Sequence, residues 1–73
     1  MDRGRKGVIN EPYLGDTIYL LDHTGRPSLA VSKVMRVVSH DRDEDLWEVV
    51  DKRSRTVIVA PGASEREWLE VDL

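Results

Sequence analysis

The chain has 73 residues, of which 40% are hydrophobic and 34% charged, with no cysteine and a formal net charge of −3 at pH 7. This length allows one small domain, and the absence of cysteine excludes disulfides and cysteine-ligated zinc. No apolar run approaches the ~20 residues that span a bilayer, and no apolar stretch of signal-peptide length follows the basic start. The sequence therefore predicts a small protein of a reducing cytoplasm.

The first seven residues, MDRGRKG, predict a flexible basic arm, and residues 8–73 predict a single small β domain. The cations of the arm are Arg3, Arg5 and Lys6. Val8 and Ile9 follow as an apolar pair, which either folds back as a first strand or adds to the sheet edge of another protein.

Runs of β-branched and aromatic residues between turn residues predict five short strands. These strands cover Thr17–Leu21, Lys33–Ser39, Leu46–Asp51, Thr56–Ala60 and Trp68–Val71. Five strands in so little sequence must avoid open edges. We therefore expect a mainly β fold, as a small five-stranded SH3-like barrel or a bent antiparallel sheet.

The segment from Ser28 to Ser39 is ambiguous, because four of its apolar residues recur at helical spacing. These are Val31, Val34, Met35 and Val38. Valine is a poor helix former, so a strand over Lys33–Ser39 is favoured over a helix, with residues 28–32 as an extended lead-in.

One short helical turn is expected before the last strand, because Ser64-Glu65-Arg66-Glu67 has the spacing of a capping box. The expected core contains the apolar residues of all five strands. Its members are Ile18, Leu20, Val34, Val37 or Val38, Trp47, Val49, Val57, Val59, Trp68, Leu69 and Val71.

Three aspartates, Asp41, Asp43 and Asp45, have the first, third and fifth positions of a calcium-binding loop. Leu46 stands where that loop needs glycine, and Lys52 stands where it needs glutamate. We therefore interpret the three as a solvated turn without a metal. Six acidic residues and one arginine between positions 40 and 51 still create a strong local field suited to docking.

No residue pattern indicates catalysis. There is no cysteine nucleophile, no serine in an activating context and no glycine-rich phosphate loop. His23 and His40 have no second ligand at metal spacing. A domain of this size has little interior left for a supported active site, so the chain is expected to be non-enzymatic, without catalytic residues or cofactors.

Basic residues gather in the arm and at one turn, which contains Lys52, Arg53 and Arg55. Such groups can meet phosphates, in contacts that depend on salt and not on sequence, or can simply be exposed and solvated. A net negative chain is repelled by free nucleic acid, so contact with RNA is expected only within a larger complex.

The opening MDRGRKGVINEPYLGDTIYLL and the closing EREWLEVDL resemble the small transcription regulators with which lytic phages of Xanthomonas take over host RNA polymerase. The resemblance implies a monomer of the host bacterial cytoplasm that binds the β and β′ subunits of RNA polymerase. It implies displacement of σ factor, which blocks initiation. It also implies suppression of termination near the RNA exit channel, together with the host factor NusA.

Charge and exposure, not the resemblance, select the candidate site residues. The expected partner-binding residues are Arg3, Arg5, Lys6, Val8, Ile9, Asp41, Asp43 and Asp45. The residues expected to face nucleic acid are Arg3, Arg5, Lys6, Lys52, Arg53 and Arg55. The alternatives are a nucleic-acid-binding barrel of the KOW or Tudor-like type and a protein adaptor with another target.

Overall fold

A computed structural model describes residues 11–71 and is mainly β. Its strands are β2 (Thr17–Leu21), β3 (Pro27–Asp41), β4 (Leu46–Asp51), β5 (Thr56–Pro61) and β6 (Glu67–Glu70). The expectation of five strands is confirmed, and the bounds of β2 and β4 agree with the sequence prediction. Within this part of the chain there is no helix long and apolar enough to cross a membrane.

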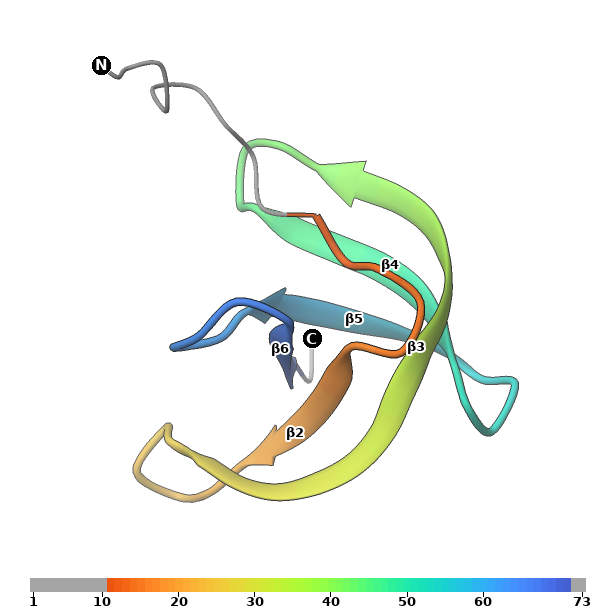
Figure 1. Cartoon of the computed structure of the whole chain (residues 1–73). Helices are drawn as coiled ribbons and strands as arrows, with labels where there is room; N and C mark the ends of the chain where they lie inside the picture. The colour runs from red at the N-terminus through yellow and green to blue at the C-terminus, as the bar shows by residue number, and fades with distance from the viewer. Residues whose placement is uncertain (1–10, 72–73) are drawn as a thin grey trace.

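The five strands form one sheet that closes on itself (Figure 1). Successive strands pair antiparallel, and β2 also pairs with β6 in parallel, with Ile18 opposite Trp68. An odd number of strands that alternate in direction leaves the first and last pointing the same way, so this closing pair must be parallel. Closure removes most of the open strand edges that a small sheet would expose.

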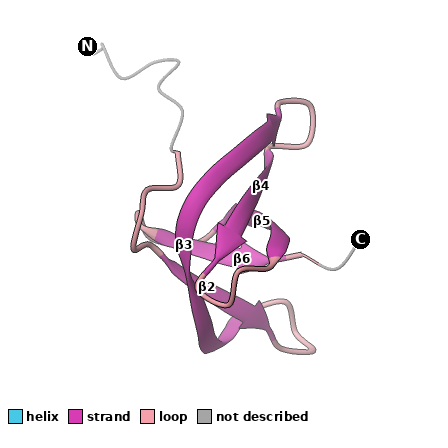
Figure 2. Cartoon of the chain, turned by 90° about the vertical axis from the view of Figure 1, so that its right-hand side faces the viewer, coloured by secondary structure: helices cyan, strands magenta, loops and turns pink. Residues whose placement is uncertain are grey.

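Strand β3 confirms the choice of strand over helix but is much longer than predicted, at 15 residues. Its first half pairs with β2 as far as Lys33, and its second half pairs with β4 from Val34 onward. Two register shifts interrupt each pairing, and such bulges bend a strand and increase its twist. Figure 2 shows the resulting curve of β3 along the molecule.

The core lies inside the closed sheet and draws on every strand. Its buried members are Ile18, Val34, Trp47, Val49, Val57, Val59 and Trp68. The two tryptophan rings meet edge to face, with centroids 6.4 Å apart. Leu20 and one of Val37 and Val38 were expected in the core, but these three side chains are 41%, 36% and 43% exposed. Leu20 lies near the end of β2, and the two valines lie where β3 has left β2.

A carboxylate, Asp16, is also buried and joins the ends of the described chain. One of its oxygens, Oδ2, accepts a hydrogen bond from the backbone N–H of Tyr13 at 2.8 Å and from Nε1 of Trp68 at 2.9 Å. The guanidinium of Arg66 lies 3.5 Å from the same oxygen and stacks over the Tyr13 ring at 4.2 Å. Asp16 thus fixes the segment before β2 against β6.

The short helical turn expected at Ser64–Glu67 is wrong, because this segment is the turn of the β5–β6 hairpin. The N–H of Gly62 donates to the carbonyl oxygen of Glu67 at 3.0 Å and closes the turn. A Cβ at position 62 would lie 2.7 Å from that oxygen, so the approach requires glycine. Arg66 has a φ of 68°, which is incompatible with a right-handed helix.

Candidate interaction surfaces

The acidic turn, residues 41–45, connects β3 to β4 and is exposed. Oδ1 of Asp41 accepts hydrogen bonds from the N–H groups of Asp43 and Glu44, at 3.0 and 3.4 Å. Asp45 adopts a left-handed φ of 55°. Asp41 thus shapes the turn, and among residues 11–71 no group of three potential metal ligands gathers here or elsewhere.

His40 connects the acidic turn to the core. Its Nε2 lies 3.1 Å from Oδ1 of Asp45, and its ring stacks on Trp47 with centroids 3.8 Å apart and planes 9° from parallel. His40 belongs to β3, and its side chain is only 14% exposed. The turn is therefore held against a packed ring rather than projecting freely.

The basic turn, residues 52–55, connects β4 to β5 and is organised by the buried carboxylate of Asp51. Oδ1 of Asp51 accepts from the N–H groups of Arg53 and Arg55, both at 2.9 Å. Oδ2 accepts from the Arg53 guanidinium at 2.9 and 3.2 Å. Arg53 is thereby partly neutralised. Lys52 differs, because within residues 11–71 no carboxylate pairs with its ammonium.

We predict that the protein loses stability in acid partly through Asp51. Burial opposes ionisation, but the hydrogen bonds from Arg55 and Arg53 outweigh it and lower the pKa of this carboxyl below its ordinary value of 3.8. A lowered folded-state pKa stabilises the fold above the unfolded value, and this stabilisation is lost as the pH falls through 3.8 and below. Urea unfolding between pH 6 and pH 3 measures the loss.

The matched variants for this prediction are Asp51→Asn and Asp43→Asn. The first should be less stable than the parent at pH 6 and should lose less stability on acidification, while the second should follow the parent. The hydroxyl and N–H donors around Asp22 lower the pKa of that carboxyl too, so some acid sensitivity should persist in both. An Asp51→Asn variant with the parent's full acid dependence would contradict the assignment.

The two charged turns lie at opposite ends of β4 (Figure 1). At about 3.3 Å per residue, the six-residue strand separates them by roughly 17 Å. The structure therefore does not bring the acidic and basic candidates into one site. The candidates in the arm and the apolar pair after it lie outside the described residues; these are Arg3, Arg5, Lys6, Val8 and Ile9.

The distal β3 patch, defined here as Met35, Val37 and Val38, was not anticipated as a surface. These side chains are 48%, 36% and 43% exposed. They lie between the point where β3 leaves β2 and the acidic turn. A signal for this surface was present in the sequence. The valine-rich run of residues 31–38 exceeds the 5–6 residues usual for a strand, so it must extend beyond the closed part of the sheet.

Comparison with known proteins adds no further constraint. No family model, curated protein or solved structure matches this chain.

Proposed function

We propose that the chain is a non-enzymatic protein-binding module that regulates bacterial RNA polymerase. In this proposal it displaces σ factor, and it suppresses termination near the RNA exit channel. The identity of the partner comes from the resemblance of the two ends of the chain, MDRGRKGVINEPYLGDTIYLL and EREWLEVDL. The displacement of σ factor and the suppression of termination come from the same resemblance. The distal β3 patch, as an exposed apolar surface suited to binding a protein, is the observation that carries the proposal.

Two properties make the distal β3 patch suitable for binding a protein. Its apolar side chains are exposed as a group, and grouped exposed apolar residues mark interaction sites more often than scattered ones do. Beyond Val34, β3 pairs with β4 alone within the described chain, so its second edge can accept a strand from a partner. The adjoining acidic turn favours a basic partner segment.

The test is co-migration of the purified chain with bacterial core polymerase, and σ displacement in the same mixture. We expect the double variant Met35→Glu/Val38→Glu to bind at least about tenfold more weakly, because two charges would be buried in the interface. Leu29→Glu is the control, since Leu29 is 60% exposed on the other half of β3. Equal affinities for the parent and the double variant would contradict the assigned surface.

The arm is tested in the same assay by charge reversal at Arg3, Arg5 and Lys6. If the arm lines a channel that carries RNA, reversal should weaken suppression of termination more than binding to polymerase, because repulsion then acts on the RNA. If neither activity changes, the channel-lining role is wrong.

We also propose that the closed sheet is an SH3-like barrel. The sequential order of the five strands supports this, as does the sharing of the bent strand β3 between two pairings. Amide contacts between Ile18 and Trp68 in solution, measured by nuclear Overhauser effects, test the closing pair.

A further inference from the structure

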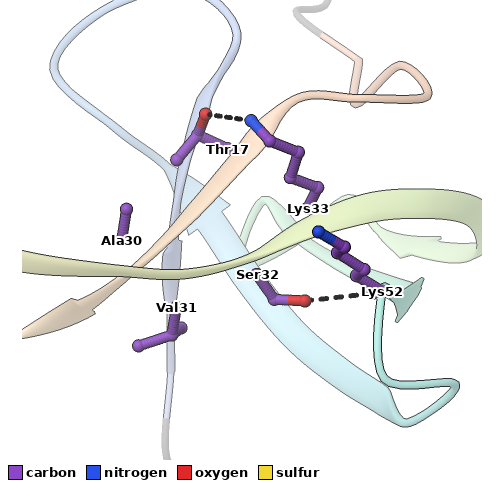
Figure 3. A pocket seen from close by; sticks show the side chains of 6 residues that line it. All are labelled: Thr17, Ala30, Val31, Ser32, Lys33 and Lys52. Carbon is purple, nitrogen blue, oxygen red and sulfur yellow. Dashed lines mark hydrogen bonds between the residues drawn. The ribbon is translucent and has the colours of Figure 1, made fainter.

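A pocket of about 200 Å³ opens beside the basic turn (Figure 3). It is lined by Thr17 of β2, by four consecutive residues of β3 and by Lys52 of the basic turn. The β3 residues are Ala30, Val31, Ser32 and Lys33. Because a water molecule occupies about 30 Å³ in the liquid, the pocket has room for a group of several heavy atoms.

The polar groups of the pocket are arranged as hydrogen-bond donors. The ammonium of Lys33 donates to Oγ1 of Thr17 at 3.4 Å, and the backbone N–H of Lys52 donates to Oγ of Ser32 at 3.0 Å. The hydroxyl oxygens of Thr17 and Ser32 thus each accept a hydrogen bond from a lysine residue. The hydroxyl hydrogens of both side chains remain available to donate to another acceptor. Two ammonium groups and two hydroxyls therefore stand around one hollow.

Acidic side chains near the pocket are engaged elsewhere. No carboxylate is among the six residues that line it. Glu67, opposite Thr17 across the β2–β6 pairing, accepts the hydroxyl of Tyr19 at 3.3 Å. Asp51, next to Lys52, is saturated by the donors of the basic turn. The two lysine charges consequently face the pocket without an internal counter-ion in the described chain.

We propose that this pocket binds a phosphate group of a nucleic-acid backbone, held by the ammonium groups of Lys33 and Lys52. The choice of phosphate over carboxylate rests on the donor types. Planar carboxylates are recognised best by the two-pronged guanidinium of arginine, whereas lysine acts as a point charge suited to phosphate. The arginine beside the pocket, Arg53, is already paired with Asp51.

The pocket supplies a single positioning contact and not a sequence-reading surface. A phosphate contact carries no base information, and the pocket residues include no aromatic side chain on which a base could stack. With a chain charge of −3, the free protein should bind weakly and only at low salt. This proposal does not require polymerase, so its test stands apart from that of the proposed function.

The experiment is a titration of the full chain at low salt, monitored by amide NMR, with four ligands: a short oligouridylate, the matching oligothymidylate, inorganic phosphate and an acidic peptide. We expect both oligonucleotides to shift the amides of Thr17, residues 31–33 and Lys52. The double variant Lys33→Gln/Lys52→Gln should bind at least about tenfold more weakly. For this variant, a plot of the logarithm of the binding constant against the logarithm of the salt concentration should have a shallower slope. The slope should change by about 0.7 for each phosphate that the variant no longer neutralises.

The matched control is Arg26→Gln/Arg42→Gln, which removes the same charge from two other exposed turns and should change affinity less than twofold. If both double variants weaken oligonucleotide binding equally, binding depends on a diffuse electrostatic field. That result would overturn the assignment of the pocket as the phosphate site. Binding of inorganic phosphate without tighter binding of either oligonucleotide would overturn the nucleic-acid assignment. Tighter binding of an acidic peptide than of the oligonucleotides would replace phosphate by carboxylate. Thermal unfolding of both variants confirms that they are folded.

Discussion

Replacement of Asp16 by alanine is expected to lower the free energy of unfolding by about 2–4 kcal/mol, because it leaves a buried N–H donor without its acceptor and removes hydrogen bonds to a charged group. Asp16 is only 5% exposed. Its Oδ2 accepts hydrogen bonds from the Tyr13 N–H and the Trp68 indole N–H and forms an ion pair with the Arg66 guanidinium. Removal leaves the buried indole N–H of Trp68 without this acceptor and takes the charge of Asp16 away from the Arg66 guanidinium.

This loss is large relative to the whole stability of so small a domain. At about 0.05–0.15 kcal/mol per residue, 73 residues correspond to roughly 4–11 kcal/mol. The Asp16→Ala variant should therefore unfold at a clearly lower urea concentration than the parent. Asp16→Asn should be intermediate, because the amide oxygen can still accept from one or both N–H groups but carries no charge toward Arg66.

Chemical unfolding followed by circular dichroism measures both variants. Asp43→Ala is the control, since Asp43 is exposed in the acidic turn and its loss should cost less than about 0.5 kcal/mol. An Asp16→Ala variant as stable as the control would show that Asp16 does not hold the chain before β2 against β6.

The sequence predicts most strands well because their apolar residues alternate simply. Leu46–Asp51 is the clearest case, since Trp47 and Val49 are buried and their neighbours are only half-buried. An alternating pattern with this period admits only an extended chain with one face inward. The bounds of such a strand follow from its residues alone.

Strand β3 is harder to predict because bulges change its period. Register shifts place Val31, Met35 and Val38 as extra residues in the pairing. Val31 packs on the core and Val34 is buried, whereas Met35 and Val38 are exposed. The four apolar residues at helical spacing therefore do not share one face, because the bulges change which side chains point inward. The bulges depend on partner strands and cannot be seen in the local sequence.

The same limit applies to the candidate sites. Charge clustering locates the acidic and basic turns, because runs of like charge must be exposed. It cannot reveal that Asp51 neutralises Arg53, or that Lys33 and Lys52, 19 positions apart in the sequence, line one pocket. Those relations arise from the β3–β4 register, in which Val34 stands opposite Asp51.

The two tryptophans should respond differently to replacement by phenylalanine, although both are buried. Trp68 is fully buried and its Nε1 donates to Asp16 at 2.9 Å. Nε1 of Trp47 is also buried but finds no hydrogen-bond partner among residues 11–71, and such an orphaned donor costs about 1–3 kcal/mol. Trp68→Phe loses packing and a charge-assisted hydrogen bond, whereas Trp47→Phe loses packing but also removes the orphaned N–H.

We therefore expect Trp68→Phe to lower the free energy of unfolding by about 2–4 kcal/mol, and Trp47→Phe to lower it by at least about 1 kcal/mol less. Circular dichroism is the appropriate readout, because each variant alters the fluorescence signal itself. Both variants lose part of the edge-to-face contact between the two rings, so that loss largely cancels in the comparison. Equal losses, or a larger loss for Trp47→Phe, would mean that Trp47 contributes through its stack on His40 more than its unpaired N–H costs.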